Sequence, residues 1–165
     1  GEPVIGFENS LYFINPECDV WCDAREFDIL TQQARLLSPR DARTEDLWRK
    51  AAKHYRGEFL LSLDADWVIP WRERFHEAYI ETLIGLGNCA RAREDMRGAI
   101  DAFRHALQVD PYREDIYRGI MNCYANLGEK RQILLYLQQL QDILQRDLDV
   151  EPSPETIALA EALLA

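Results

Sequence analysis

The chain has 165 residues, of which 47% are hydrophobic and 29% charged, and its formal net charge is −10. This composition is typical of a folded protein with its own core and excludes a disordered chain. No apolar run approaches the length of a membrane span and no basic, apolar leader opens the chain, so we expect a cytoplasmic protein with no membrane partner. Residues 1–28 hold seven acidic side chains against Arg25 alone. Because duplex DNA repels such a surface, we expect this segment not to bind DNA by itself.

Residues 4–14 have a β-strand pattern that the rest of the chain lacks. Two short β-rich runs, Val4–Phe7 and Leu11–Ile14, flank Glu8-Asn9-Ser10, which suits a hairpin turn. An isolated two-stranded hairpin is only marginally stable in water. We therefore expect another part of a larger protein to pack against it.

A connector and two helices are predicted next. Residues 16–23 suit an extended connector in which Trp21 can pack on the next element of the chain. Asp23 is suited to cap a helix that runs to about Leu37, and Asp41 or Thr44 opens a second helix.

The segment after the second helix has no regular period. Glu58–Ile69 is too apolar for a solvated loop, so we expect it to wrap across the core. Trp48 and Trp67 are both predicted to be core residues.

A long helix is predicted to begin near residues 66–70, because proline is tolerated in a first helical turn. Tight turns at 93–95 and 127–129 separate the helices that come after it. Ser153 and Pro154 have the pattern of an N-cap and first helical residue, so they open a last helix that closes the fold. The helices expected between these points are Asp95–Asp110, Arg113–Leu127 and Glu129–Leu148.

Residues 86–111 have the spacing of a tetratricopeptide unit, a helix–turn–helix repeat of about 34 residues. Apolar character recurs one repeat further along the chain, which relates Cys89 to Cys123 as equivalent core positions. One such unit cannot bury its apolar face alone, so it requires neighbours. The predicted fold is all-α, a tetratricopeptide-like stack of about seven helices with a short N-terminal β-hairpin. The positions that keep the repeat spacing are Leu86, Gly87, Ala99, Phe103, Ala106 and Pro111.

Several short stretches occur in an order that a known family shares. They are Trp21-Cys22-Asp23-x-x-x-Phe27, Tyr55–Leu60, Asp66-Trp67-Val68 followed by Arg72, Asp110-Pro111-x-x-Glu114, Tyr117-Arg118 with Met121, Tyr124 and Gly128, and Val150–Thr156. On these residues the chain resembles the bacterial transcriptional activator domain, the helical domain that comes after the DNA-binding module in antibiotic-pathway regulators.

The resemblance implies a domain division. Residues 1–19 would be the C-terminal hairpin (the wing) and connector of a truncated winged-helix DNA-binding domain, and residues 20–165 the activator domain. Promoter DNA would then be bound only through the missing upstream winged helix. The implied partners are other domains of the same regulator, RNA polymerase or a second copy of the chain.

No catalytic constellation is visible, so we predict that the chain is not an enzyme and needs no cofactor. His54, His76 and His105 fall on different predicted helices with no recognisable nucleophile. Glu73 and His76 form one Glu-x-x-His pair, whereas a di-iron site needs two and further carboxylates. Cys18 and Cys22 are the one pair that could form a metal or redox site, but no second Cys or His pair accompanies them.

The repeat register also predicts a groove lined by the first helix of each pair. Asn88 and Arg91 fall there from one repeat, and Arg118, Asn122 and Asn126 from the next. These side chains could bind a peptide backbone, a carboxylate or a phosphate, or they could be ordinary solvated residues. The alternative to an interaction domain is therefore a sensor that binds a peptide or small anionic ligand in this groove. On that hypothesis Arg118→Glu weakens binding and leaves the melting temperature nearly unchanged.

Overall fold

The chain is an all-α stack of tetratricopeptide-like helical hairpins preceded by a two-stranded antiparallel hairpin, as predicted. The structure, a computed structural model, describes residues 4–16, 18 and 20–165. Glu2, Glu17 and Asp19, which belong to the predicted acidic segment, lie outside the described residues. In chain order the elements are β1 (Ile5–Glu8), β2 (Leu11–Ile14), α1 (Asp23–Arg35), α2 (Ala42–His54), the 3-10 turn η1 (Asp66–Val68), α3 (Ile69–Ala92), α4 (Met96–Val109), α5 (Glu114–Asn126), α6 (Lys130–Leu148) and α7 (Pro154–Leu164).

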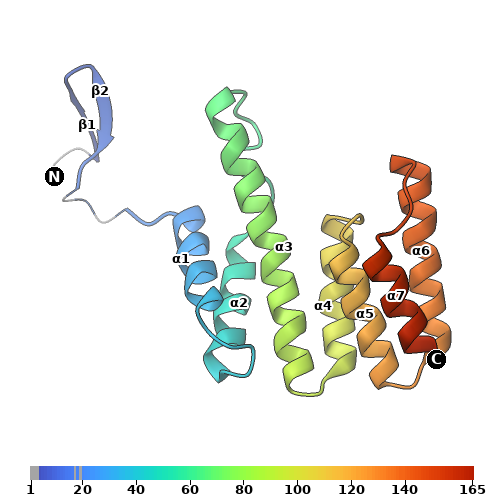
Figure 1. Cartoon of the computed structure of the whole chain (residues 1–165). Coiled ribbons are helices and arrows are strands. Elements are labelled where there is room, and N and C mark those ends of the chain that lie inside the picture. The colour runs from blue at the N-terminus through green and yellow to red at the C-terminus, as the bar shows by residue number, and fades with distance from the viewer. Residues whose placement is uncertain (1–3, 17, 19) are drawn as a thin grey trace.

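Each helix packs on the next one in the chain, and α7 packs on both α5 and α6. Figure 1 shows the helices standing side by side from α1 to α6, with the hairpin beyond α1 at one end and α7 against the other. Helices α1, α3 and α5 are the first members of successive pairs. This order is the one expected when each unit buries its apolar face against its neighbours.

The hairpin is closed by a two-residue turn. Asn9 and Ser10 have φ values of 52° and 64°, and Glu8 pairs with Leu11. Positive φ at both central residues is the type I′ geometry, whose twist matches that of the strands. Glu8 therefore belongs to the strand and not to the turn, because pairing its backbone continues the ladder.

Short polar side chains cap the starts of α2, α4 and α7. The predicted cap at Asp23 is wrong, because Asp23 is the first residue of α1 and Cys22 precedes it without a side-chain cap bond. Asp41 accepts the backbone N–H of Arg43, and Asp95 accepts that of Gly98, each at 2.9 Å. The Ser153 hydroxyl accepts the N–H of Thr156 at 3.4 Å. These bonds satisfy backbone donors that a helix leaves free in its first turn. The predicted caps at Asp41 and Ser153 are therefore confirmed.

Close approach of α3 to its neighbours depends on two glycines. A Cβ built on Gly87 would lie 2.4 Å from the Phe103 ring, and one on Gly85 would lie 2.4 Å from Trp48. Both aromatic side chains are buried, Phe103 at 2% exposed. Phe103, one of the positions that keep the repeat spacing, therefore fills the space between α3 and α4, and the predicted burial of Trp48 is confirmed. Cys89 and Cys123 are both buried.

Phe59 packs on the core beside Phe75, but most of the segment between α2 and α3 lies at the surface, so the prediction that it wraps across the core is wrong. Trp67 is 58% exposed, and Leu61 is also exposed, although Val68 is buried. The Arg72 guanidinium donates to the backbone carbonyls of Phe59 and Leu60, at 2.9 and 2.6 Å, and to that of Leu63. Because one arginine satisfies these backbone acceptors, the segment can stand at the surface. Trp21 is likewise 66% exposed, and its ring centroid lies 6.0 Å from that of His54.

Candidate functional site

One continuous groove runs along α3 and α5. Helix α3 lines it with residues spaced alternately three and four apart, which places them on one face. Three neighbouring hollows make up the groove, and each shares lining residues with the next: Ile84 and Asp115 join the first two, and Arg91 and Asn122 join the last two. We call this surface the α3–α5 groove. The α3 residues that line it at this spacing are Arg74, Glu77, Glu81, Ile84, Asn88 and Arg91, and Ala78 lines it as well.

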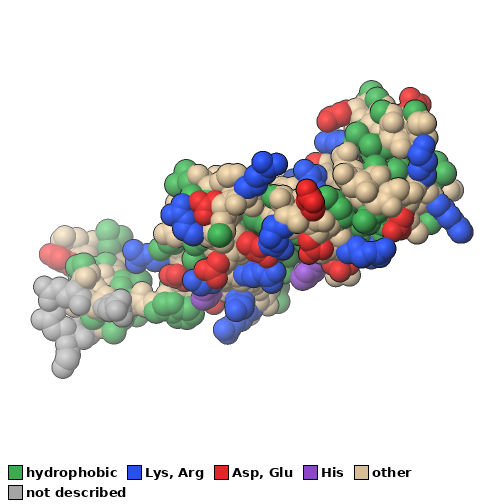
Figure 2. Space-filling view, turned by 90° about the horizontal axis from the view of Figure 1, so that it is seen from below, with side chains coloured by type: hydrophobic (Ala, Val, Ile, Leu, Met, Phe, Trp, Pro, Cys, Tyr) green, Lys and Arg blue, Asp and Glu red, His purple; other side chains and the backbone are tan. Residues whose placement is uncertain are grey.

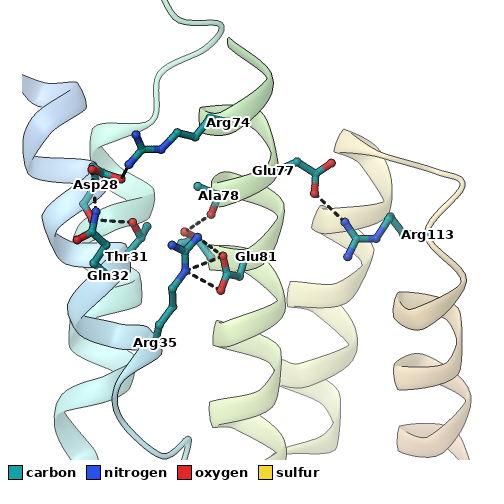
Figure 3. A network of polar contacts seen from close by, with 10 residues as sticks. Asp28, Thr31, Gln32, Arg35, Arg74, Glu77, Ala78, Glu81 and Arg113 are labelled. Atoms are coloured by element: carbon teal, nitrogen blue, oxygen red, sulfur yellow. Dashed lines mark hydrogen bonds and ion pairs between the residues drawn. The ribbon is translucent and has the colours of Figure 1, made fainter. Parts of the chain in front are cut away.

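The end of the groove nearest α1 is lined by charged side chains, and we call it the charge-paired half. It is a hollow of about 500 Å³ between α1, α3 and α5. Figure 3 shows how its side chains point toward one another from the three helices. The charged residues of this half are Asp28, Arg35, Arg74, Glu77, Glu81, Arg113 and Asp115.

Ion pairs join the helices across this half. Arg35 of α1 pairs with Glu81 of α3, and the Arg74 guanidinium of α3 lies 2.6 Å from the Asp28 carboxylate of α1. Arg113, just before α5, donates to Glu77 of α3 at 3.1 Å (Figure 3). It also donates to Asp115 at 3.0 Å. Every charged side chain of this half therefore has an opposite charge beside it.

The charges of this half also stabilise one another's ionised forms. The hydrogen bond with Glu81 raises the pKa of Arg35, even though burial acts in the opposite direction. Burial raises the pKa of Asp115, but the hydrogen bond and positive charge of Arg113 outweigh it, so that this pKa lies below its ordinary value. In both cases the ion-pair partner favours the charged form of the side chain.

The other half of the groove contains all five residues that the sequence places there. Asn88, Arg91, Arg118 and Asn122 line a hollow of about 240 Å³. Arg91 and Asn122 line the adjoining hollow of about 290 Å³ together with Asn126 and Met96. We call this part the amide half. The structure brings the five side chains together, as their register in the repeat predicts.

The polar groups of the amide half are largely unused. The Asn122 and Asn126 amide groups donate to the backbone carbonyls of Arg118 and Asn122, at 2.9 and 2.7 Å, which leaves both side-chain oxygens without a donor in the described chain. Asn88 and Arg91 make no side-chain hydrogen bond or ion pair with any residue that the structure describes. Arg91 is exposed. These groups are available to a ligand.

Arg118 differs from its four neighbours because it is tied to α7. Its guanidinium donates to the Thr156 hydroxyl at 2.8 Å and lies 4.0 Å from the Glu114 carboxylate. Arg118→Glu would therefore place a second carboxylate beside Glu114. We revise the expectation of an unchanged melting temperature accordingly, since like charges at four-residue spacing destabilise a helix.

Glu114 anchors the start of α7. Its carboxylate accepts the Ser153 backbone N–H at 3.0 Å, the Ser153 hydroxyl at 2.6 Å and the Thr156 hydroxyl at 2.5 Å. Burial raises the pKa of Glu114, but these hydrogen bonds and the charge of Arg118 outweigh it and hold the pKa below its ordinary value. The sequence places Glu114 in a stretch shared with the family but does not indicate this role, because its partners lie 39 and 42 residues further along the chain.

The other residues considered for chemistry are not brought together. His54, His76 and His105 lie on α2, α3 and α4. Cys18 and Cys22 are free cysteines, and the described residues contain no group of three or more potential metal ligands. None of the described helices combines the length and apolar character needed to cross a membrane. In Figure 2 basic and acidic side chains are interspersed across the middle of the visible face, an arrangement unlike the basic stripe of a nucleic-acid site.

Comparison with known proteins agrees with this architecture. The sequence matches the family model described as the bacterial transcriptional activator domain over residues 22–164. The fold is similar to that in a structure of Mycobacterium tuberculosis EmbR in complex with a low affinity phosphopeptide, with a TM-score of 0.76 and 19% sequence identity. The match covers 98% of this chain and 43% of that one. No curated protein sequence matches the chain.

Proposed function

We propose that this chain, which belongs to the bacterial transcriptional activator domain family, is the regulatory protein-interaction part of a DNA-binding transcription activator. On this proposal residues 1–19 are the wing and connector of a winged-helix DNA-binding domain, and residues 20–165 are the activator domain. Promoter DNA is bound by the winged helix that precedes this segment. The protein works in the cytoplasm and catalyses no reaction.

One observation carries the DNA-binding part of the proposal: the hairpin has an apolar face that the described residues leave uncovered. Ile5, Phe7, Tyr12 and Ile14 share this face by their pairing, and each is at least 61% exposed. A two-stranded hairpin needs a further apolar layer to be stable. The body of a winged helix would supply that layer on the N-terminal side. The EmbR chain in the matched structure is more than twice as long as this chain, and more than half of it lies outside the matched region, which is enough for additional domains.

The interaction part of the proposal is supported by the α3–α5 groove. Its amide half presents polar groups of α3 and α5 that have no partner among the described residues, so few bonds are lost when a partner binds. The candidate partners are another domain of the same regulator, RNA polymerase and a second copy of the chain.

Selection from random DNA duplexes at physiological salt tests the DNA-binding proposal. We expect residues 1–165 to enrich no sequence, and the same chain extended upstream by its native segment to enrich one motif. Enrichment of a motif by residues 1–165 alone would overturn the proposal. A folded, extended chain that enriches nothing would overturn it as well.

The second candidate function is a sensor that binds a small anionic ligand in the same groove, favoured by the unpaired Arg91. Thermal-shift measurements with nucleotides and inorganic phosphate distinguish the two, since a ligand that binds the native state raises the melting temperature. Stabilisation that disappears in Arg91→Gln would favour the sensor. No stabilisation by any of these anions would favour the interaction domain.

A further inference from the structure

We propose that the amide half of the α3–α5 groove binds an extended peptide segment that carries an acidic side chain. Arg91 binds the carboxylate, Asn88 and Asn122 bind the peptide backbone, and the hollow beside them takes a small apolar side chain. This inference rests on the proposed interaction function and names the chemistry of its partner.

The unused hydrogen-bonding groups match those of an extended backbone. Asn88 offers a carbonyl oxygen and two N–H donors, and Asn122 offers its free side-chain oxygen. Asn88 and Asn122 are one repeat apart and line the same hollow. An extended peptide presents N–H and C=O groups in alternation, so one asparagine on each helix can bond to it.

The distribution of charge in the groove indicates that the acidic side chain of the peptide binds at Arg91. The other arginines of the groove, Arg35, Arg74, Arg113 and Arg118, each have a carboxylate within 4.0 Å. An acidic ligand at any of them must compete with that carboxylate. At Arg91 it forms a new pair without breaking one, because no described acidic side chain lies within ion-pair distance. A guanidinium binds a carboxylate through parallel N–H donors, which fixes the orientation of the peptide.

The floor of the hollow determines which further side chain of the peptide can bind, after the backbone and the acidic side chain. Ile84, Phe103 and Ile116 give it apolar walls, and Gly119 lies between the helices where a side chain would narrow it. A Cβ at Gly119 would lie 3.2 Å from the Phe103 ring. At about 240 Å³ the hollow has room for one small aliphatic side chain, and the adjoining hollow of about 290 Å³ continues the groove past Arg91 and Asn122. This elongated shape suits successive residues of an extended peptide.

Display of random heptapeptides against residues 1–165 tests the inference. We expect the selected peptides to share one Asp or Glu with a small aliphatic residue close to it. A synthetic copy of the strongest binder, measured by fluorescence anisotropy, should bind Arg91→Gln and Asn88→Ala about tenfold more weakly. Arg131→Gln is the matched control, because Arg131 is an exposed arginine on α6 with no partner in the described chain; its affinity should equal that of the wild type.

Charge reversal makes the test specific to the carboxylate. A display against Arg91→Glu should select Lys or Arg at the position where the wild type selects an acid. Peptides without an acidic residue, or affinities that do not change in Arg91→Gln and Asn88→Ala, would overturn the inference. A display that yields no binder would do the same. If inorganic phosphate stabilises the protein through Arg91 while no peptide is selected, the groove is a small-anion site and the peptide inference is wrong.

These outcomes are independent of the DNA-binding proposal. The selection from DNA duplexes uses the extended chain and requires no groove ligand. Peptides that bind outside the groove would leave an interaction domain in place and remove only the chemistry proposed here.

Discussion

The two halves of the α3–α5 groove lie on the same helices but use their polar side chains differently. In the charge-paired half, Arg35, Arg74 and Arg113 are all bonded to carboxylates on another helix. In the amide half, Asn88 and Arg91 have no partner among the described residues. The first half uses its polar groups to hold neighbouring helices in register. The second leaves them for a partner.

The difference shows why the number of charges in a groove is a poor guide to ligand binding. The charge-paired half holds more charged residues than the amide half. Its charges already neutralise one another, so a ligand that binds there must break existing pairs and gains little. A single unpaired arginine beside free amides is the stronger indication of a site.

Phe103→Ala should have the largest effect, because it removes the floor shared by α3, α4 and α5. The Phe103 ring fills the space against Gly87 and Gly119. We expect a loss of about 3–5 kcal/mol in the free energy of unfolding, as for other buried aromatic side chains replaced by alanine. Urea denaturation followed by circular dichroism measures it. Gln108→Ala, at an exposed position on α4, is the control and should change stability by less than about 0.5 kcal/mol. A loss from Phe103→Ala no larger than that of the control would contradict the packing described.

Glu114→Gln should have the next largest effect, through the docking of α7. The substitution removes the charge from a carboxylate that accepts three hydrogen bonds from Ser153 and Thr156. We expect a loss of about 1–3 kcal/mol at neutral pH, measured by denaturation. Glu114→Asp keeps the charge but shortens the side chain. Its free energy of unfolding should lie between those of the wild type and Glu114→Gln.

The pH dependence of this loss is set by the lowered pKa of Glu114. A carboxyl group with a lower pKa in the folded state contributes its full stability above the unfolded pKa of about 4.3 and loses it as the pH falls through the folded value. The difference between wild type and Glu114→Gln should therefore be constant from pH 7 to about pH 5 and shrink below about pH 4.3. A difference that grows toward acidic pH would show that Glu114 is not bonded as described.

The sequence predicted the helices and the five residues of the amide half because both keep the spacing of the tetratricopeptide repeat. It could not predict the charge-paired half, because Asp28–Arg74 and Arg35–Glu81 are each 46 residues apart. This separation is longer than one repeat, and the excess arises in the irregular segment before α3. The prediction that Trp67 is buried was also wrong. The composition of the segment does not show that Arg72 donates hydrogen bonds to its backbone carbonyls and so allows the segment to lie at the surface. The partners of Arg118 were missed because α7 folds back on α5.

Arg35→Gln should have a smaller effect, through the loss of one ion pair between α1 and α3. Both side chains of the Arg35–Glu81 pair are 43% exposed, and exposed pairs contribute about 0.2–1 kcal/mol. We expect a loss in this range that becomes smaller in high salt, because salt screens the pair. Glu81→Gln should cost a similar amount, and the double substitution should cost less than the sum of the two. Strictly additive losses would show that the pair contributes nothing.

Arg91→Gln should have the smallest effect on stability, and it is the direct counterpart of Arg35→Gln. Both substitutions remove one positive charge from a chain of net charge −10, so their effects on overall repulsion are similar. They differ only in the local pair, which Arg35 has and Arg91 lacks. We expect Arg91→Gln to change the free energy of unfolding by less than about 0.5 kcal/mol, with no dependence on salt beyond that of the wild type. Parallel denaturation of the two variants at low and high salt measures the contrast. Equal, salt-sensitive losses would mean that Arg91 is also bonded within the fold, and then the amide half would not be free to bind a partner.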